Sequence, residues 1–272
     1  NAEAILKCPQ YKRSEMVQVS ASDLLEPDEI KKIQNELLEI RKDSHDFFTL
    51  LANTGMRENE ALGLCVGFIF EGKIKGKKLD KLHNQLTVCG LEDYHGYICL
   101  ESQPALPRLR TDKRFKDRFG VTWDTDSVPR KPLKLRRKIE AENYRFIPIF
   151  DKQTWNIIAE RWNQQHDSLE KKTHGKESRD YLLFDGLTTS MFYGDLQKAF
   201  DKAKLRFRSP HKLRHTFLTW FYDKTDENRF LAKKVAGHNE ERSVQVYSHM
   251  NEQIGREQER KEQSKRKMKL IS

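Results

Sequence analysis

The sequence is poor in cysteine, and its few cysteines form no metal-binding pattern. They are Cys8, Cys65, Cys89 and Cys99, and no two of them stand in a C-x-x-C spacing. This argues against a structural zinc site, although Cys89 and Cys99 could pair in principle. Nothing in the sequence indicates secretion, so reduced thiols and a cytoplasmic location are the default expectation.

Long apolar runs, a signal peptide, internal repeats and low-complexity tracts are also missing. No apolar stretch approaches the roughly 20 residues that a membrane-spanning helix needs. The first residues, Asn1 to Ala4, do not resemble a signal peptide and do not begin with Met, so we expect a fragment of a longer protein. There is no cluster of acidic residues that would suit a metal-dependent phosphoesterase.

Positive charge is what the sequence has in excess. It contains 51 Lys and Arg against 41 Asp and Glu, a formal net charge of +10 over 272 residues. Such an excess favours an anionic partner, of which nucleic acid is the commonest, while a merely soluble basic protein is the competing interpretation. The length allows one large domain or two smaller ones.

The segment Pro210–Phe217 predicts the start of a central helix. Ser209 is a favoured N-cap residue, and Pro210 suits the first helical position. Leu213, Phe217 and Phe221 recur at four-residue steps, so we expect them to form the buried stripe of the helix.

His211 and Arg214 give this helix a basic first turn. They are three positions apart and should share one face, close to the free N–H groups and the positive end of the helix dipole. An imidazole and a guanidinium at that place could bind a phosphate. The pattern is weak by itself, and a basic surface turn explains it as well.

Three further segments accompany this one in a fixed order. Thr54–Leu64 reads T-G-M-R-E-N-E-A-L-G-L and carries Arg57 and Glu60; Gly237–His238 follows the helix, and Tyr247 comes nine positions after the histidine. Together they resemble the tyrosine recombinase (phage integrase) family, which is marked by T-G-x-R-x-x-E-x-L, H-x-x-R-H-T-F, G-H and a nucleophilic tyrosine. Each motif alone is modest, but their ordered occurrence is highly specific.

The resemblance implies a mostly helical α+β fold with a small antiparallel sheet. Residues 21–250 would be the catalytic domain, and 66–130 would contain an insertion in it. Residues 1–20 would be a linker from an absent N-terminal DNA-binding domain, and residues 251–272 a C-terminal tail.

The resemblance also implies site-specific DNA recombination, in which DNA is cut and rejoined through a 3′-phosphotyrosine without metal, ATP or another cofactor. Two arginines and two histidines would bind the phosphate, a tyrosine would attack it, a lysine would protonate the leaving oxygen, and a glutamate would support an arginine. By motif match these residues are Arg57, Arg214, His211, His238, Tyr247, Lys138 and Glu60.

The lysine assignment depends on a predicted hairpin. Residues 133–138 and 144–149 read as two strands, and in the family such a hairpin carries a lysine a few residues before an R-x-I/V-P segment, here Arg145–Pro148. Lys138 is the best-placed lysine, and Lys134 is the alternative.

A basic run between residues 108 and 118 could follow a DNA backbone. Phe115 and Phe119 are interleaved with its charges, and a solvated charged loop is about equally compatible. The run consists of Arg108, Arg110, Lys113, Arg114, Lys116 and Arg118.

The remaining chain gives coarser predictions of secondary structure. Helices are expected from Pro27 onward, around residues 47–51 up to a break at Gly55, and over residues 155–162, 192–203 and 230–235, the last closed by Gly237. Strands are expected at 67–70, 85–88 and 97–100, with a basic loop at 73–81 and a polar loop at 166–180.

The implied partners are double-stranded DNA attachment sites and further copies of the chain in a homo-tetramer, with room for an accessory directionality factor and no membrane. A prokaryotic cell, a phage or a mobile element would encode such a protein. The alternatives are a type IB topoisomerase-like strand transferase and a non-catalytic DNA-binding protein on the same fold.

Overall fold

The computed structural model describes residues 23–73, 77–100, 102–104, 130–132, 145–172 and 182–237. Several predictions from the sequence concern residues outside these ranges. They are the assignments of Lys134, Lys138, His238 and Tyr247, the basic run at 108–118, the strand at 133–138, the linker at 1–20 and the tail at 251–272.

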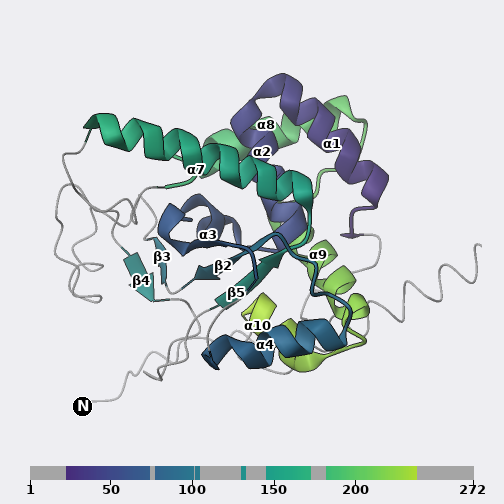
Figure 1. The fold of residues 1–272 in the computed structure, drawn as a ribbon. Helices are drawn as coiled ribbons and strands as arrows, with labels where there is room; N and C mark the ends of the chain where they lie inside the picture. The colour runs from purple at the N-terminus through teal and green to yellow at the C-terminus, as the bar shows by residue number, and fades with distance from the viewer. Residues whose placement is uncertain are drawn as a thin grey trace, which may run out of the picture.

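Within the described residues the chain is mainly helical (Figure 1). The helices are α1 (Pro27–Ile40), α2 (Lys42–Thr54), α3 (Glu58–Leu62), α4 (Lys77–Val88), α7 (Lys152–Lys172), α8 (Thr189–Lys202), α9 (Pro210–Lys224) and α10 (Arg229–Ala236), with a short 3₁₀ turn, η2 (Val66–Phe68). The strands are β1 (Ile69–Glu71), β2 (Gly96–Leu100), β3 (Ser102–Pro104), β4 (Arg130–Pro132) and β5 (Arg145–Ile149).

The central sheet is antiparallel and has the strand order β1-β2-β5, while β3 and β4 form a separate antiparallel pair. In its register, Ile98 of β2 lies opposite Ile147 of β5. The predicted fold class, a mostly helical α+β domain with a small antiparallel sheet, is confirmed.

Helices cover both faces of this sheet, so every residue of β5 is buried. Because successive side chains of a strand point to opposite faces, neighbouring residues enter different cores. Ile98 and Ile147 join a core cluster built with α1, α2 and α8. Tyr97 and Phe146 join a second cluster built with α4, α9 and α10. Figure 1 shows the sheet between these two groups of helices.

The central helix begins where the sequence predicts it. Ser209 is the N-cap residue of α9 and Pro210 is its first residue. Leu213, Phe217 and Phe221 are all buried, so the predicted apolar stripe is confirmed. The stripe contributes to both core clusters, since Leu213 lies in the first and Phe217 in the second.

The loop predicted at 73–81 and the strand predicted at 85–88 are wrong, because α4 spans Lys77–Val88. Leu82 and Leu86 are buried one helical turn apart, and α4 packs against α10. A four-residue apolar spacing belongs to a helix, and it was obscured by the many charged residues around it.

Two other boundaries are corrected. The polar loop predicted at 166–180 begins too early, because α7 continues to Lys172. The strand predicted at 67–70 also begins too early, because Val66–Phe68 form a 3₁₀ turn and the strand starts at Ile69.

Part of the segment predicted to hold an insertion belongs to the core. Within residues 66–130, β2 is the middle strand of the sheet, and α4 supplies side chains to the second cluster. Cys89 and Cys99 are free thiols, so the pairing left open by the sequence is not formed. Among the described helices, none is both long and apolar enough to cross a membrane.

Candidate active site

The site is built on the sharp turn that joins α2 to α3. Gly55 ends α2 in the left-handed conformation, with φ of 58°, and its N–H donates to the carbonyl of Leu51 at 3.1 Å. A Cβ atom at this position would lie 2.5 Å from Cδ1 of Phe217. Glycine therefore permits both the turn and the direct approach of α9 to the end of α2.

Arg57 and Glu60 are joined at the start of α3. Arg57 is the N-cap residue, and its backbone N–H donates to Oε2 of Glu60 at 3.0 Å. Its side-chain Nη1 donates to Oε1 of the same carboxylate at 2.8 Å. The Arg57 side chain is 29% exposed while that of Glu60 is 3% exposed. The buried Glu60 carboxylate thus binds the partly exposed guanidinium of Arg57. A glutamate that orients Arg57 would make this contact.

Glu60 is kept ionised by the arginines around it. Burial of the carboxyl would raise its pKa, but the positive charges of Arg145, Arg57 and Arg214 and the N–H bond from Arg57 outweigh that effect and lower the pKa to about 2. Glu60 is therefore a carboxylate at any pH near neutrality.

Arg214 reaches the same turn from α9. It is buried, and its Nη1 donates to the Gly55 carbonyl at 2.6 Å, a contact between residues 159 positions apart. Its Nη2 donates to the carbonyl of Ala236, the last residue of α10. Arg214 thus connects the ends of α2 and α10.

His211 lies one turn before Arg214 and is exposed. Its ring meets that of His215 edge to face, with centroids 4.5 Å apart. Burial, and then the charges of His211, Lys212 and Arg214, lower the pKa of His215 to about 4, against a smaller opposing effect of Asp23. His215 is therefore neutral near pH 7, while His211 is on the surface at the helix start.

Arg145 completes the cluster, and the sequence analysis assigned it no role. Its Nη1 donates to Oε2 of Glu60, its Nη2 to the Gly55 carbonyl at 3.1 Å, and its Nε to the Val235 carbonyl at 2.6 Å. The signal that could have revealed it is an arginine at the head of an otherwise apolar strand that is buried throughout. Such a charge needs partners in the core.

The described residues thus include three of the six predicted catalytic residues. Arg57 and Arg214 come together around Glu60, and His211 lies on the surface of the helix that carries Arg214. Lys138, His238 and Tyr247 lie outside the described residues. Helix α10 ends at Ala236, two positions before His238, so the last described residues lead directly to that motif.

This arrangement concentrates positive charge, and Arg57 is the member of the cluster whose guanidinium is partly exposed. Guanidinium groups are always charged, and each can bind two oxygens of a phosphate. In the described part of the chain no group of three or more His, Cys, Asp or Glu side chains is placed to hold a metal ion.

The fold and the site define a mostly helical α+β domain with a small antiparallel sheet and an arginine cluster around a buried carboxylate. The chain belongs to the phage integrase family, which it matches over residues 114–253, just over half of its length. The resemblance drawn from the sequence motifs is thereby confirmed.

Comparison with solved structures finds recombinases at low sequence identity. The XerH site-specific recombinase in a pre-cleavage complex with its difH substrate has a TM-score of 0.45 at 17% identity, covering 84% of this chain and 50% of that one. The XerA recombinase has a TM-score of 0.43 at 16% identity, and the match covers 88% of this chain and 65% of that one. The Tn1549 transposon integrase in complex with circular intermediate DNA has a TM-score of 0.45 at 14% identity, and the match covers 82% of this chain and 60% of that one. The chain thus spans about half of the length of the XerH chain. Comparison with curated proteins gives no significant match.

Proposed function

We propose that this chain is the catalytic domain of a site-specific tyrosine recombinase that cuts and rejoins duplex DNA through a 3′-phosphotyrosine. The observation that carries the proposal is the convergence of Arg57 and Arg214 on one turn around an ionised Glu60. Membership of the phage integrase family and the net charge of +10 support it.

The proposed chemistry begins with charge neutralisation. A phosphodiester repels nucleophiles, and negative charge grows on its oxygens as a fifth bond to phosphorus forms. Arg57 and Arg214 would bind these oxygens, and His211 and His238 would add hydrogen bonds. Groups held in place before the reaction lower its barrier without reorganising.

Covalent transfer would follow in a balanced exchange. The Tyr247 hydroxyl gives its proton to His211 or to solvent, and its oxygen attacks phosphorus. The bond to the 5′ oxygen breaks, and Lys138, or alternatively Lys134, gives that oxygen a proton. A tyrosine hydroxyl ordinarily ionises at about pH 10, so nearby cations must assist its deprotonation. The phosphotyrosine bond conserves the energy of the broken bond, so rejoining needs neither ATP nor a metal.

The proposed partners are duplex attachment sites and other copies of the chain. Four protomers would act on two sites, exchange one pair of strands at a time and pass through a Holliday junction. The basic run at residues 108–118 would contact the DNA backbone, through which Lys and Arg bind by releasing counterions. An accessory factor that sets direction is compatible with this assembly.

The test uses a pool of nicked duplexes with a randomised centre. Strand cleavage near a nick lets the short product diffuse away, so covalent protein–DNA adducts accumulate and can be sequenced. We expect the 272-residue chain to trap a defined sequence with equal yield with and without EDTA. Adduct that vanishes in EDTA and returns with magnesium would contradict the tyrosine mechanism.

The same experiment separates the alternatives. Adduct without sequence preference, together with relaxation of supercoiled plasmid, would indicate a type IB topoisomerase-like strand transferase. Retention of duplex DNA with no adduct at any sequence would indicate a non-catalytic DNA-binding protein.

A further inference from the structure

We propose that Arg145 is a positioning residue that sets the orientation of Arg57 through Glu60 and at the same time holds the end of α10. The inference rests on the proposed function, because it assigns Arg145 to the cleavage reaction.

Arg145 joins three segments that are far apart in the sequence. It lies at the first residue of β5 and binds the carbonyl that ends α2, the carboxylate of Glu60 in α3 and the Val235 carbonyl near the end of α10. The guanidinium has five N–H donors in a rigid planar fork, so it can bind all three in one geometry. Val235 is 90 positions away along the chain, and α10 leads directly to His238.

Arg145 and Arg214 share the Gly55 carbonyl and bind successive carbonyls at the end of α10. Arg145 donates a hydrogen bond to the Val235 carbonyl, and Arg214 donates one to the Ala236 carbonyl. The unpaired carbonyls at the end of a helix attract cations, so both arginines stabilise that end. A small displacement of Arg145 would consequently move both the Glu60–Arg57 pair and the start of the segment that carries His238.

Three arginines from three elements face Glu60. They are Arg57 at the N-cap of α3, Arg145 of β5 and Arg214 of α9. Without Arg145, only Arg57 and Arg214 would counter the effect of burial on the Glu60 carboxyl. The pKa of Glu60 would then rise, so Glu60 would become protonated as the pH falls. A protonated Glu60 holds Arg57 less firmly, and cleavage by the variant should decline at acidic pH where the wild type does not.

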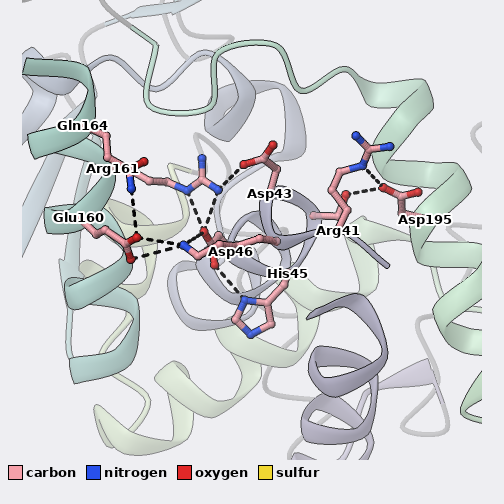
Figure 2. A network of polar contacts seen from close by, with 10 residues as sticks. Arg41, Asp43, His45, Asp46, Glu160, Arg161, Gln164 and Asp195 are labelled. Carbon is pink, nitrogen blue, oxygen red and sulfur yellow. Dashed lines mark hydrogen bonds and ion pairs between the residues drawn. The ribbon is translucent and has the colours of Figure 1, made fainter. Parts of the chain in front are cut away.

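A matched control exists in a second buried arginine. Arg161 of α7 donates to Asp46 at 2.7 Å and to Asp43 at 2.6 Å (Figure 2). It also packs over the ring of Phe184. These partners lie in the first turns of α2, at the end opposite to Gly55. Removing Arg161 therefore disrupts a buried ion-pair cluster of similar kind without contacting the Arg57 turn.

The experiment compares Arg145→Met, Arg145→Lys and Arg161→Met with the wild type. The probe is the nicked duplex selected by the wild type from the randomised pool. Three quantities are measured for each variant: the adduct rate constant at saturating DNA from about pH 5 to pH 8, the dissociation constant for the intact duplex, and the melting temperature.

We expect Arg145→Met to lose about a hundredfold in the rate constant, as a misplaced catalytic group does, and to show a new decline at acidic pH. DNA affinity should change by much less. Arg145→Lys should keep the flatter pH profile, since it keeps the positive charge, while recovering only part of the rate. Arg161→Met should lower the melting temperature and leave the rate constant and its pH profile unchanged.

The double variant Glu60→Gln with Arg145→Met should be slow but should lose the acidic decline, since no carboxyl remains to titrate. Persistence of the decline would overturn the inference, as would rates of Arg145→Met equal to those of Arg161→Met. Should Arg145→Met fail to fold, Arg145→Lys decides: a wild-type rate at every pH overturns the inference, and a reduced rate with normal DNA affinity supports it. Absence of adduct from the wild type would instead refute the proposed function, and the inference with it.

Discussion

At the scale of single residues, Arg214 serves both the fold and the site. Two of its N–H groups bind the backbone carbonyls of Gly55 and Ala236, so its plane is held by two helices. Glu60 is similarly shared, since it accepts the N–H that starts α3 and also pairs with two guanidinium groups. Substitutions at this scale test the proposed roles directly.

Tyr247→Phe should bind DNA like the wild type and form no covalent adduct. The variant lacks only the oxygen that would attack phosphorus. The measurement is adduct yield on the selected nicked duplex, beside a gel-shift assay on the intact duplex. Adduct formed by the variant would mean that another tyrosine is the nucleophile, and the exposed Tyr193 and the buried Tyr222 should then be replaced in turn.

Arg214→Lys should cleave about a hundredfold more slowly, which corresponds to a lost transition-state interaction of ~3 kcal/mol. A lysine has no planar fork, so it cannot bind the Gly55 and Ala236 carbonyls together while also facing a phosphate. The adduct rate constant at saturating DNA measures the effect. A near wild-type rate would show that the fork is not needed for cleavage.

Lys138→Ala should be rescued by a duplex with a 5′-bridging phosphorothiolate. Its sulfur leaves without a proton, so the general acid becomes dispensable. Arg57→Ala should stay inactive on the same duplex, because charge on the phosphate oxygens still has to be neutralised. If the sulfur rescues Lys134→Ala while Lys138→Ala already cleaves normal DNA, the acid is Lys134.

At the scale of elements, the junction of α2 with α9 determines where the arginines stand. The end of α2 lies against the Phe217 ring of α9. The Gly55 carbonyl there accepts hydrogen bonds from both Arg145 and Arg214. The position of this one carbonyl depends on how closely the two helices approach, so a side chain inserted between them should affect stability and cleavage together.

Gly55→Ala should lower both the melting temperature and the cleavage rate. A left-handed alanine costs roughly 1–2 kcal/mol, and its Cβ would also meet Phe217 at 2.5 Å. Gly90→Ala is the matched control, since Gly90 also has positive φ, 67°, but nothing lies within 4 Å of its added Cβ. The difference between the two melting temperatures measures the clash, and equal values would show that α9 moves aside at little cost.

At the scale of the whole molecule, two buried ionic clusters among the described residues tie the layers together. One surrounds Glu60 at the meeting point of the two hydrophobic cores. The other joins α2 to α7 through Asp46 and Arg161 (Figure 2). Burial acts to raise the pKa of Asp46, but hydrogen bonds from His45 and Arg161 outweigh it, so the pKa is lowered. Both carboxylates therefore stabilise the folded chain in their ionised form.

Stability should consequently fall in acid, and Glu60 should contribute part of the loss. Its pKa is 4.5 in the reference state and about 2 in the folded state. Its contribution is thus complete above the unfolded value and is lost as the pH falls from there towards the folded one. We expect Glu60→Gln to be less stable than the wild type at pH near 7 and to show a shallower decline below about pH 5.

Urea unfolding at a series of pH values measures this dependence. The control is Glu39→Gln, which removes an exposed carboxylate of α1 and should leave the acid slope unchanged. Parallel curves for Glu60→Gln and the wild type would contradict the assigned role of the carboxylate.

Sequence determined the local features of this protein. The start of α9 at Ser209 and Pro210, the end of α2 at Gly55 and the buried stripe from Leu213 to Phe221 all follow from neighbours within a turn or two. The ordered motifs determined the family, because they need no distance information. The α4 helix does not follow from the sequence, because charged residues surround its two buried leucines and obscure their four-residue spacing.

Tertiary structure alone brought Arg145 into the arginine cluster and decided which carbonyls Arg145 and Arg214 bind. Arg57 and Glu60 are close along the chain, but Arg145 lies 85 positions from Glu60, and Arg214 lies 159 from Gly55. No local pattern reports which carbonyl a distant guanidinium will bind. That choice follows from burial: a charge enclosed between two cores must be paired, and Glu60 with the ends of α2 and α10 supplies the acceptors that Arg145 and Arg214 reach.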